Sequence, residues 1–315
     1  MMYRRMAGIP ILIVGLVLLL QGCSSGKARV EDQIAAVEQN LNGIRDALSA
    51  NGIRNATIIR QYSEVLKNKR PELRSLLVEL EKDATVKGPL FLGLEDRLQK
   101  VRDGAGFDSW TEKLDEASKL NSATVRETYN DALSDTVNVL ADLSEGELAR
   151  VNAISQTAEK TLNKSRDQGP GSQYVGNPHY GQWSHGAGGS FWAWYGQYAF
   201  FSSMFGRNHY YHDWAGNRGY SYYHDVGRNH YTSRSQRASQ LDVDNRSRKQ
   251  FGTQGRYKSP YARTRGGSAG LSSGSRGLQK STFKSQYSSS GKTSKFQSSS
   301  RNSGFRTSSG FSRGK

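Results

Sequence analysis

The sequence contains a single cysteine, Cys23, among its 315 residues. A lone cysteine excludes an intramolecular disulfide, so any folded part of the chain must be stabilised by its apolar core alone. Its position directly after an apolar stretch also argues against a catalytic thiol. Neither a P-loop nor a GxSxG or GxGxxG pattern occurs in the strand context that such chemistry requires, and we therefore expect no enzyme activity.

Acidic residues are absent from the last part of the chain, where the final one is Asp244. Residues 245–315 carry 16 Lys or Arg, which equals the net charge of +16 of the whole chain. A charge asymmetry of this kind predicts a basic interaction tail. The tail consists mainly of Ser, Gly, Lys and Arg, which bury too little apolar surface to offset chain entropy. We therefore expect it to be disordered in the free protein.

This basic tail has three interpretations. It contacts phosphate-rich or other anionic polymers electrostatically, it binds single-stranded nucleic acid through Arg and aromatic side chains, or it is a solvated segment with weak affinity for anions. The cations that we expect to contact an anionic partner are Arg246, Arg248, Lys249, Arg263, Arg265, Lys280, Lys284, Arg301 and Arg306.

The first 22 residues have the three parts of a secretory signal. Two arginines are followed by an apolar run at 9–20 and then by two residues that precede Cys23. The run is about a dozen residues long, which is too short to span a hydrocarbon core of ~30 Å. Its ending, Leu20-Gln21-Gly22-Cys23, resembles the lipobox of bacterial lipoproteins.

That resemblance implies that residues 1–22 are removed and that Cys23 becomes the mature N-terminus, carrying a diacylglycerol thioether and an N-acyl chain such as palmitate. Several acyl chains together anchor a protein stably, at about 0.8 kcal/mol per buried CH₂. Ser24 in place of Asp implies transport to the outer membrane, where we expect the periplasmic face. An uncleaved N-terminal membrane anchor is the alternative. Secretion makes lipopolysaccharide, anionic glycans or a protein complex the expected partners, and nucleic acid a partner only outside the cell.

Residues 27–166, which follow a linker at 23–26, have the pattern of helices. Steps of four and three separate the apolar residues of one stripe, namely Val30, Ile34, Val37, Leu41, Ile44 and Leu48. Further helices are predicted at 53–68, from Pro71 onward and from Pro89 to Gly104, and capping-box patterns begin at Ser109 and Ser144. We predict an all-α bundle of five or six helices with its own core. An extended antiparallel coiled coil is the alternative.

Aliphatic residues almost vanish from residues 168–244, where Gly, Tyr, Trp, Asn and His dominate. We expect this aromatic segment to be largely disordered, like the tail at 245–315. Its uncharged cluster at 191–205 would pack on the bundle, on a partner or at a membrane interface. All six histidines lie between 179 and 230.

Histidine-rich tracts can bind zinc, copper or nickel. The candidate ligands lie within 22 residues of one another and are His209, His212, Asp213, His224, Asp225 and His230. Neither an HExxH motif nor a helical i, i+4 histidine pair is present to position them rigidly. The alternative is a flexible segment with adventitious metal affinity, and we expect no cofactor other than the lipid on Cys23.

A second resemblance concerns the aromatic patch and the tail. Gly189-Ser190-Phe191-Trp192, Gly304-Phe305 and Gly310-Phe311 resemble elements of a bacterial family of secreted proteins of unknown function (DUF1190). This resemblance implies secretion and no particular activity. Taken together, the sequence favours an outer-membrane-anchored structural or interaction protein. The alternatives are a metal- or glycan-binding module formed by the His/Tyr segment, and an accessory subunit of an envelope complex.

Overall fold

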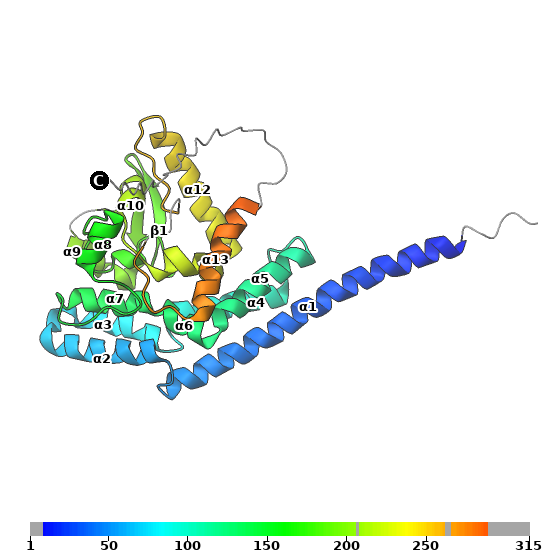
Figure 1. Ribbon diagram of the computed structural model, residues 1–315, viewed down its shortest axis with the longest axis horizontal. Helices are drawn as coiled ribbons and strands as arrows, with labels where there is room; N and C mark the ends of the chain where they lie inside the picture. Colours follow the sequence, from blue (N-terminus) through cyan, green and yellow to red (C-terminus); the bar gives the residue numbers. More distant parts are fainter. Residues whose placement is uncertain (1–8, 206–207, 262–265, 289–315) are drawn as a thin grey trace, which may run out of the picture.

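A computed structural model describes residues 9–205, 208–261 and 266–288, and these residues are predominantly helical (Figure 1). The helical character expected for residues 27–166 is confirmed, although the chain forms more helices than the five or six predicted. Among the described residues, no helix is both long enough and apolar enough to cross a membrane.

The first helix, α1 (Ile9–Ser49), is the longest, and its N-terminal part extends beyond the rest of the molecule (Figure 1). The predicted apolar stripe is correct, because from Val30 onward five of its six residues are buried in the core and Ile34 packs against it. The helix ends where Asn51 adopts a positive φ of 56°, one residue before the glycine expected there.

Two helices pack along α1 as a hairpin, α4 (Pro89–Asp103) and α5 (Trp110–Thr124). The ion pairs Arg45–Glu95 and Glu38–Arg102 show that α4 runs antiparallel to α1. Consequently α5 runs parallel to α1, and the loop between α4 and α5 lies at the end where α1 leaves the body.

Apart from α2 (Arg54–Lys69), the remaining helices of the N-terminal half are short. They are η1 (Pro71–Leu73), α3 (Arg74–Glu81), η2 (Lys82–Ala84), α6 (Arg126–Ala132), α7 (Ser134–Leu143) and α8 (Gln156–Asn163). The helix start predicted at Ser144 is wrong, since α7 ends at Leu143. The Ser144 hydroxyl instead donates to the carbonyl of Ala141 and accepts the N–H of Leu148. Ser144 thus closes a helix and does not open one.

The aromatic segment at 168–244 is folded, which corrects the expectation of disorder. Its elements are η3 (Ser172–Tyr174), β1 (Gly181–Gly186), β2 (Gly189–Trp194), η4 (Gly196–Tyr198), α9 (Phe200–Phe205), α10 (Tyr211–Asn217), a π-helical turn η5 (Tyr223–Gly227) and α11 (Arg228–Tyr231). The strands form an antiparallel hairpin that pairs Trp183 with Trp192. Large aromatic side chains provide the buried area that the missing aliphatic residues do not.

The boundary expected between residues 244 and 245 falls inside a helix. Helix α12 (Arg234–Phe251) continues through it, and α13 (Ser273–Ser288) packs against η5 and α6. One apolar core contains Val37 of α1, Tyr222 and Leu278, so the two halves of the sequence form one body. A smaller cluster around Trp192 and Trp214 lies beneath the hairpin.

Candidate functional site

The residues considered as metal ligands have other partners in the structure. Nε2 of His224 lies 2.8 Å from the carbonyl oxygen of Val175, and Asp225 forms a buried ion pair with Arg218 at 2.6 Å. Burial lowers the pKa of His230 to about 4. Within the described ranges, no three His, Cys, Asp or Glu side chains form a group that could hold a metal ion.

The other three candidates are dispersed. His212 stacks on Phe251 with a centroid separation of 4.1 Å, and Asp213 faces Arg166 at 3.4 Å. His209 is buried, and its carbonyl accepts the N–H of Trp192 in strand β2. The six residues are therefore close in sequence without converging on one point.

The cations of the expected tail fall into two groups. Arg246 and Arg248 are paired with Asp242 and Asp244 one turn earlier on α12, and Lys249 and Lys280 are exposed. Arg263, Arg265, Arg301 and Arg306 lie outside the described residues, as do the side chains of Lys284 and Cys23.

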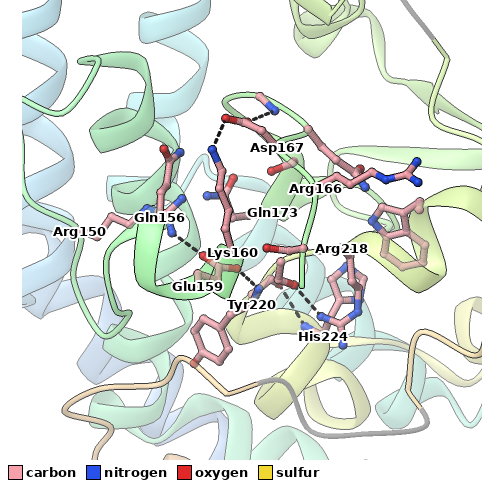
Figure 2. Close-up of a pocket in the computed structure, with 17 residues that line it drawn as sticks. Arg150, Gln156, Glu159, Lys160, Arg166, Asp167, Gln173, Arg218, Tyr220 and His224 are labelled. Atoms are coloured by element: carbon pink, nitrogen blue, oxygen red, sulfur yellow. Dashed lines mark hydrogen bonds and ion pairs between the residues drawn. The ribbon is translucent and has the colours of Figure 1, made fainter. Parts of the chain in front are cut away.

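A polar pocket lies where the loop after α8 meets α10 and η5 (Figure 2). Its charged groups neutralise one another. Arg150 binds both Asp142, at 2.7 Å, and Glu159, at 2.6 Å. Lys160 binds Asp167 at 2.8 Å. No buried cation of this pocket is left to hold an anionic ligand, among the side chains described.

The same pocket contains buried polar atoms that lack a partner in the described part of the chain. They are Oε1 of Gln168, Oε1 of Gln173, the hydroxyl of Tyr220 and Nδ1 of His224. The free space measures about 40 Å³, which has room for a few water molecules and no larger ligand. We interpret the pocket as a hydrated joint between α8 and the aromatic segment.

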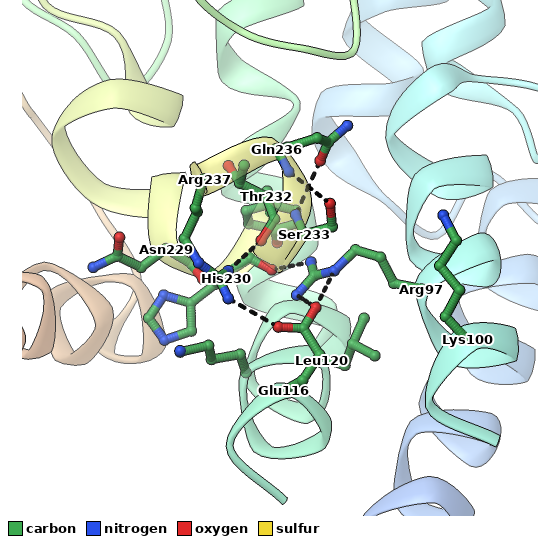
Figure 3. Close-up of polar contacts among 12 residues, drawn as sticks. Arg97, Lys100, Glu116, Leu120, Asn229, His230, Thr232, Ser233, Gln236 and Arg237 are labelled. Carbon is green, nitrogen blue, oxygen red and sulfur yellow. Dashed lines mark hydrogen bonds and ion pairs between the residues drawn. The ribbon is translucent and has the colours of Figure 1, made fainter. Parts of the chain in front are cut away.

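A second polar cluster joins α4, α5 and the start of α12 (Figure 3). Glu116 accepts hydrogen bonds from Arg97 at 2.7 Å and from Arg237 at 3.0 Å. Arg97 also donates to the carbonyl of His230. Burial pushes the pKa of Glu116 upward, but the two arginines outweigh it and hold that pKa below its ordinary value. This cluster connects His230 and Arg237 to the helices α4 and α5 of the bundle.

A larger groove of about 380 Å³ lies between the β-hairpin and α12. One wall is aromatic and is formed by Trp183, Trp192 and Tyr195. The other wall is one face of α12, with the polar side chains Ser235, Gln236, Ser239, Gln240, Asp242 and Arg246. An aromatic wall facing a row of hydrogen-bonding groups is typical of a small-molecule site.

The end of the body from which α1 projects carries an exposed tryptophan. Trp110 begins α5 and is 42% exposed, and a Cβ built on Gly26 would lie 3.6 Å from its Cβ. The ammonium of Lys113 lies 5.3 Å from the centre of the indole ring. The capping box predicted here is half formed, because the Ser109 hydroxyl accepts the N–H of Glu112 while Glu112 accepts that of Asp108.

The pattern GxSxG occurs at residues 270–274, near the start of α13, with Ser272 at its centre. Ser272 follows a loop and no strand, and its hydroxyl accepts the N–H of Ser275 as a helix cap. Its own N–H donates to Asp131. The position is structural.

The comparisons with known proteins give no relative. Searches found no family model, no curated protein and no solved structure that matches this chain.

Proposed function

We propose that this chain is a lipoprotein of the cell envelope, anchored in the outer membrane through lipid on Cys23 and acting as a structural or interaction protein. The folded body would sit directly against the membrane surface. The observation that carries the proposal is the position of the exposed Trp110 of α5 beside Gly26 of α1, where a Cβ added to the glycine would lie 3.6 Å from the Cβ of the tryptophan.

This position of Trp110 matters because it is close to the lipobox cysteine, Cys23. Cys23 and Gly26 lie on the same helix, three residues apart, which corresponds to about 5 Å along the axis. Trp110 is therefore near the level of the lipid attachment. Tryptophan is favoured at membrane–water interfaces, where its apolar ring and polar N–H are both accommodated. An exposed tryptophan beside the anchor supports a body that rests on the bilayer.

Binding, not catalysis, is the role that we assign to the body and tail. The cations of the tail beyond α12 would contact an anionic envelope polymer, such as lipopolysaccharide or a glycan, or a protein complex. Arg246 and Arg248 contribute less than the sequence suggested, since both are paired with carboxylates on α12. Paired and exposed charges of this kind add little to binding.

The test is processing and fractionation of a Cys23→Ala variant in cells fed labelled palmitate. We expect the variant to remain unprocessed, unlabelled and absent from the outer-membrane fraction. Ser25→Ala is the matched control, because it changes a neighbouring position and leaves the lipobox intact; it should behave as the parent chain. Normal processing and labelling of Cys23→Ala would refute the proposal. Ser24→Asp should move the lipidated chain to the inner membrane.

A further inference from the structure

We propose that the groove between the β1–β2 hairpin and α12 binds a neutral saccharide, with sugar rings packed on the aromatic wall and sugar hydroxyls bonded to α12. The site does not depend on the lipid anchor or on the part of the basic tail beyond α12. It is formed by residues that lie within the folded body.

The aromatic wall is held in place by packing. Its accessible rings are those of Trp183 and Tyr195, because Trp192 is only 4% exposed. Trp183 is half-buried, and its ring makes edge contacts with Trp192 at 5.2 Å and Tyr211 at 5.0 Å, measured between ring centroids. Tyr195 stands at the rim and is 37% exposed. Sugar rings present flat C–H faces that pack on aromatic faces, and a wall fixed in advance loses little entropy on binding.

A glycine is needed for Trp192 to pack this closely on the hairpin. A Cβ at Gly181 would lie 2.7 Å from Cζ2 of Trp192 and 2.5 Å from the carbonyl oxygen of Ala193. Both separations are shorter than van der Waals contact. The absence of a side chain at Gly181 therefore lets the indole of Trp192 lie against strand β1.

The facing wall combines hydrogen-bond donors and acceptors: hydroxyls and amides that do both, the Asp242 carboxylate, which accepts, and the Arg246 guanidinium, which donates. Ser235, Ser239, Asp242 and Arg246 follow one another at helical spacing along α12, and Gln236 lies beside them. Gln182 faces solvent from the hairpin side. Hydroxyls and amides match the mixed donor and acceptor character of sugar hydroxyls.

The charge of the groove favours a neutral ligand. Asp242 and Arg246 form an exposed ion pair at 2.6 Å, so the two charges at this wall cancel. An anionic polymer that approached Arg246 would also be repelled by the carboxylate of Asp242. An acyl chain would cover the polar groups of α12 without bonding them, which is unfavourable. A saccharide satisfies both walls.

The experiment is calorimetric titration of the full-length chain in detergent with cellotriose, chitotriose and maltotriose, and with a heparin disaccharide as the anionic probe. We expect at least one neutral trisaccharide to bind. Tyr195→Ala and Gln182→Ala should each weaken that binding by about tenfold, the loss expected for one good contact. Leu241→Ala is the matched control, because Leu241 is exposed on α12 outside the groove.

Trp183→Phe provides a second readout, since it keeps the aromatic packing and should alter the fluorescence change on binding. Failure of all three neutral trisaccharides to bind would overturn the proposal. Equal binding by Tyr195→Ala and the parent chain, or binding of the heparin probe alone, would do so as well. Cys23→Ala should bind as the parent chain does, which separates this test from that of the lipid anchor.

Discussion

Arg97 of α4 and Glu116 of α5 form an ion pair at 2.7 Å in which each side chain is only 3% exposed. The pair lies under the start of α12, where Arg237 reaches the second carboxylate oxygen of Glu116. Removing a charge from water is costly, and such a pair is favourable only when its remaining atoms are also bonded. Here Arg97 also donates to the carbonyl of His230, whereas its Nη2 makes no hydrogen bond among the described atoms.

Glu116→Ala should therefore destabilise the protein strongly. The change leaves two arginines without their counterion, and breaking a buried pair costs about 3–5 kcal/mol. The measurement is urea denaturation. Arg97→Met combined with Glu116→Leu should recover part of the loss, since it removes both buried charges. A loss below about 1 kcal/mol for Glu116→Ala, as at an exposed pair, would contradict the assignment.

Asp135 has a comparable role at the contact between α7 and η5. Its carboxylate accepts the backbone N–H groups of Tyr222 and Tyr223, at 2.8 and 2.9 Å, and the hydroxyl of Ser221 at 3.0 Å. Asp135→Ala leaves these three buried donors unpaired, at about 1–3 kcal/mol each. We expect a loss of several kcal/mol by denaturation, and none for the exposed control Asp46→Ala. Similar stability of both variants would disprove the contact.

The contribution of Asp83 to the free energy of unfolding should decrease as pH rises from about 4 to about 6. Burial raises the pKa of Asp83 to about 6, against the opposing hydrogen bonds from Thr136 and Tyr180. Above its ordinary pKa the unfolded chain has released this proton while the folded chain retains it. Protonation thus stabilises the fold by up to about 3 kcal/mol, and this contribution is lost as pH passes the folded pKa.

Asp83→Asn should remove this part of the pH dependence. Asn keeps an oxygen for the two hydroxyls, and its amide replaces Oδ1, which has no partner among the described atoms. Denaturation at about pH 4.5 and about pH 7.5 gives the difference for each chain. An unchanged difference in the variant would show that Asp83 is not responsible. The remaining pH dependence has two opposing parts. Asp135, whose pKa burial raises to about 7, contributes with the same sign as Asp83, whereas His179 and His230, whose pKa values burial lowers to about 4, contribute with the opposite sign.

Added zinc or nickel should leave the melting temperature unchanged. A ligand that binds only the folded state raises stability, but His224, Asp225 and His230 are already buried in other contacts. Differential scanning calorimetry with and without equimolar metal is the measurement. An increase that His224→Ala abolishes would restore the metal hypothesis.

Trp110 should report contact with the bilayer. In vesicles of brominated lipid, the mature lipidated chain is expected to lose more tryptophan fluorescence than its Trp110→Ala variant. The reason is that Trp110 lies at the end of the body from which α1 projects, whereas Trp192 and Trp214 are buried. Vesicles without bromine serve as the control. Equal quenching of both chains would place Trp110 away from the membrane.

The helical half was predictable because its core uses aliphatic residues at regular spacing. Val37, Leu41 and Ile44 are buried as the pattern indicates. Helix α4 likewise begins at Pro89 and ends at Gly104, which adopts a left-handed conformation. Helix boundaries and buried faces could be predicted wherever they depend on residues that are close in sequence.

The aromatic half was not predictable in the same way, since its stability comes from distant partners. Tyr180 stacks on Tyr174 at 3.6 Å and bonds to Asp83, nearly a hundred residues earlier. No periodicity in residues 168–244 indicates such pairs. One local signal was present, however. Ser233 and Gln236 form a complete capping box at the start of α12, and this S-x-x-Q pattern could have located the helix.

The groove could be anticipated only as an aromatic patch. Trp183 and Trp192 are directly opposite each other in the hairpin, but the sequence does not show that α12 faces them. That juxtaposition depends on the buried contacts of Tyr211 with Asp244 and of Gln240 with Gly176. Both join residues more than thirty positions apart.

Helix α13 makes contacts with segments that are distant in sequence, and this affects the order in which the protein folds. Ser272 donates to Asp131, and Ser275 bonds to the hydroxyl of Tyr222, with Leu278 in the core beside them. The first of these bonds spans 141 residues. Contacts between such distant segments form late, because the loop between them must close first. The body is thus complete only when α13, the last helix among the described residues, has reached its place against η5 and α6.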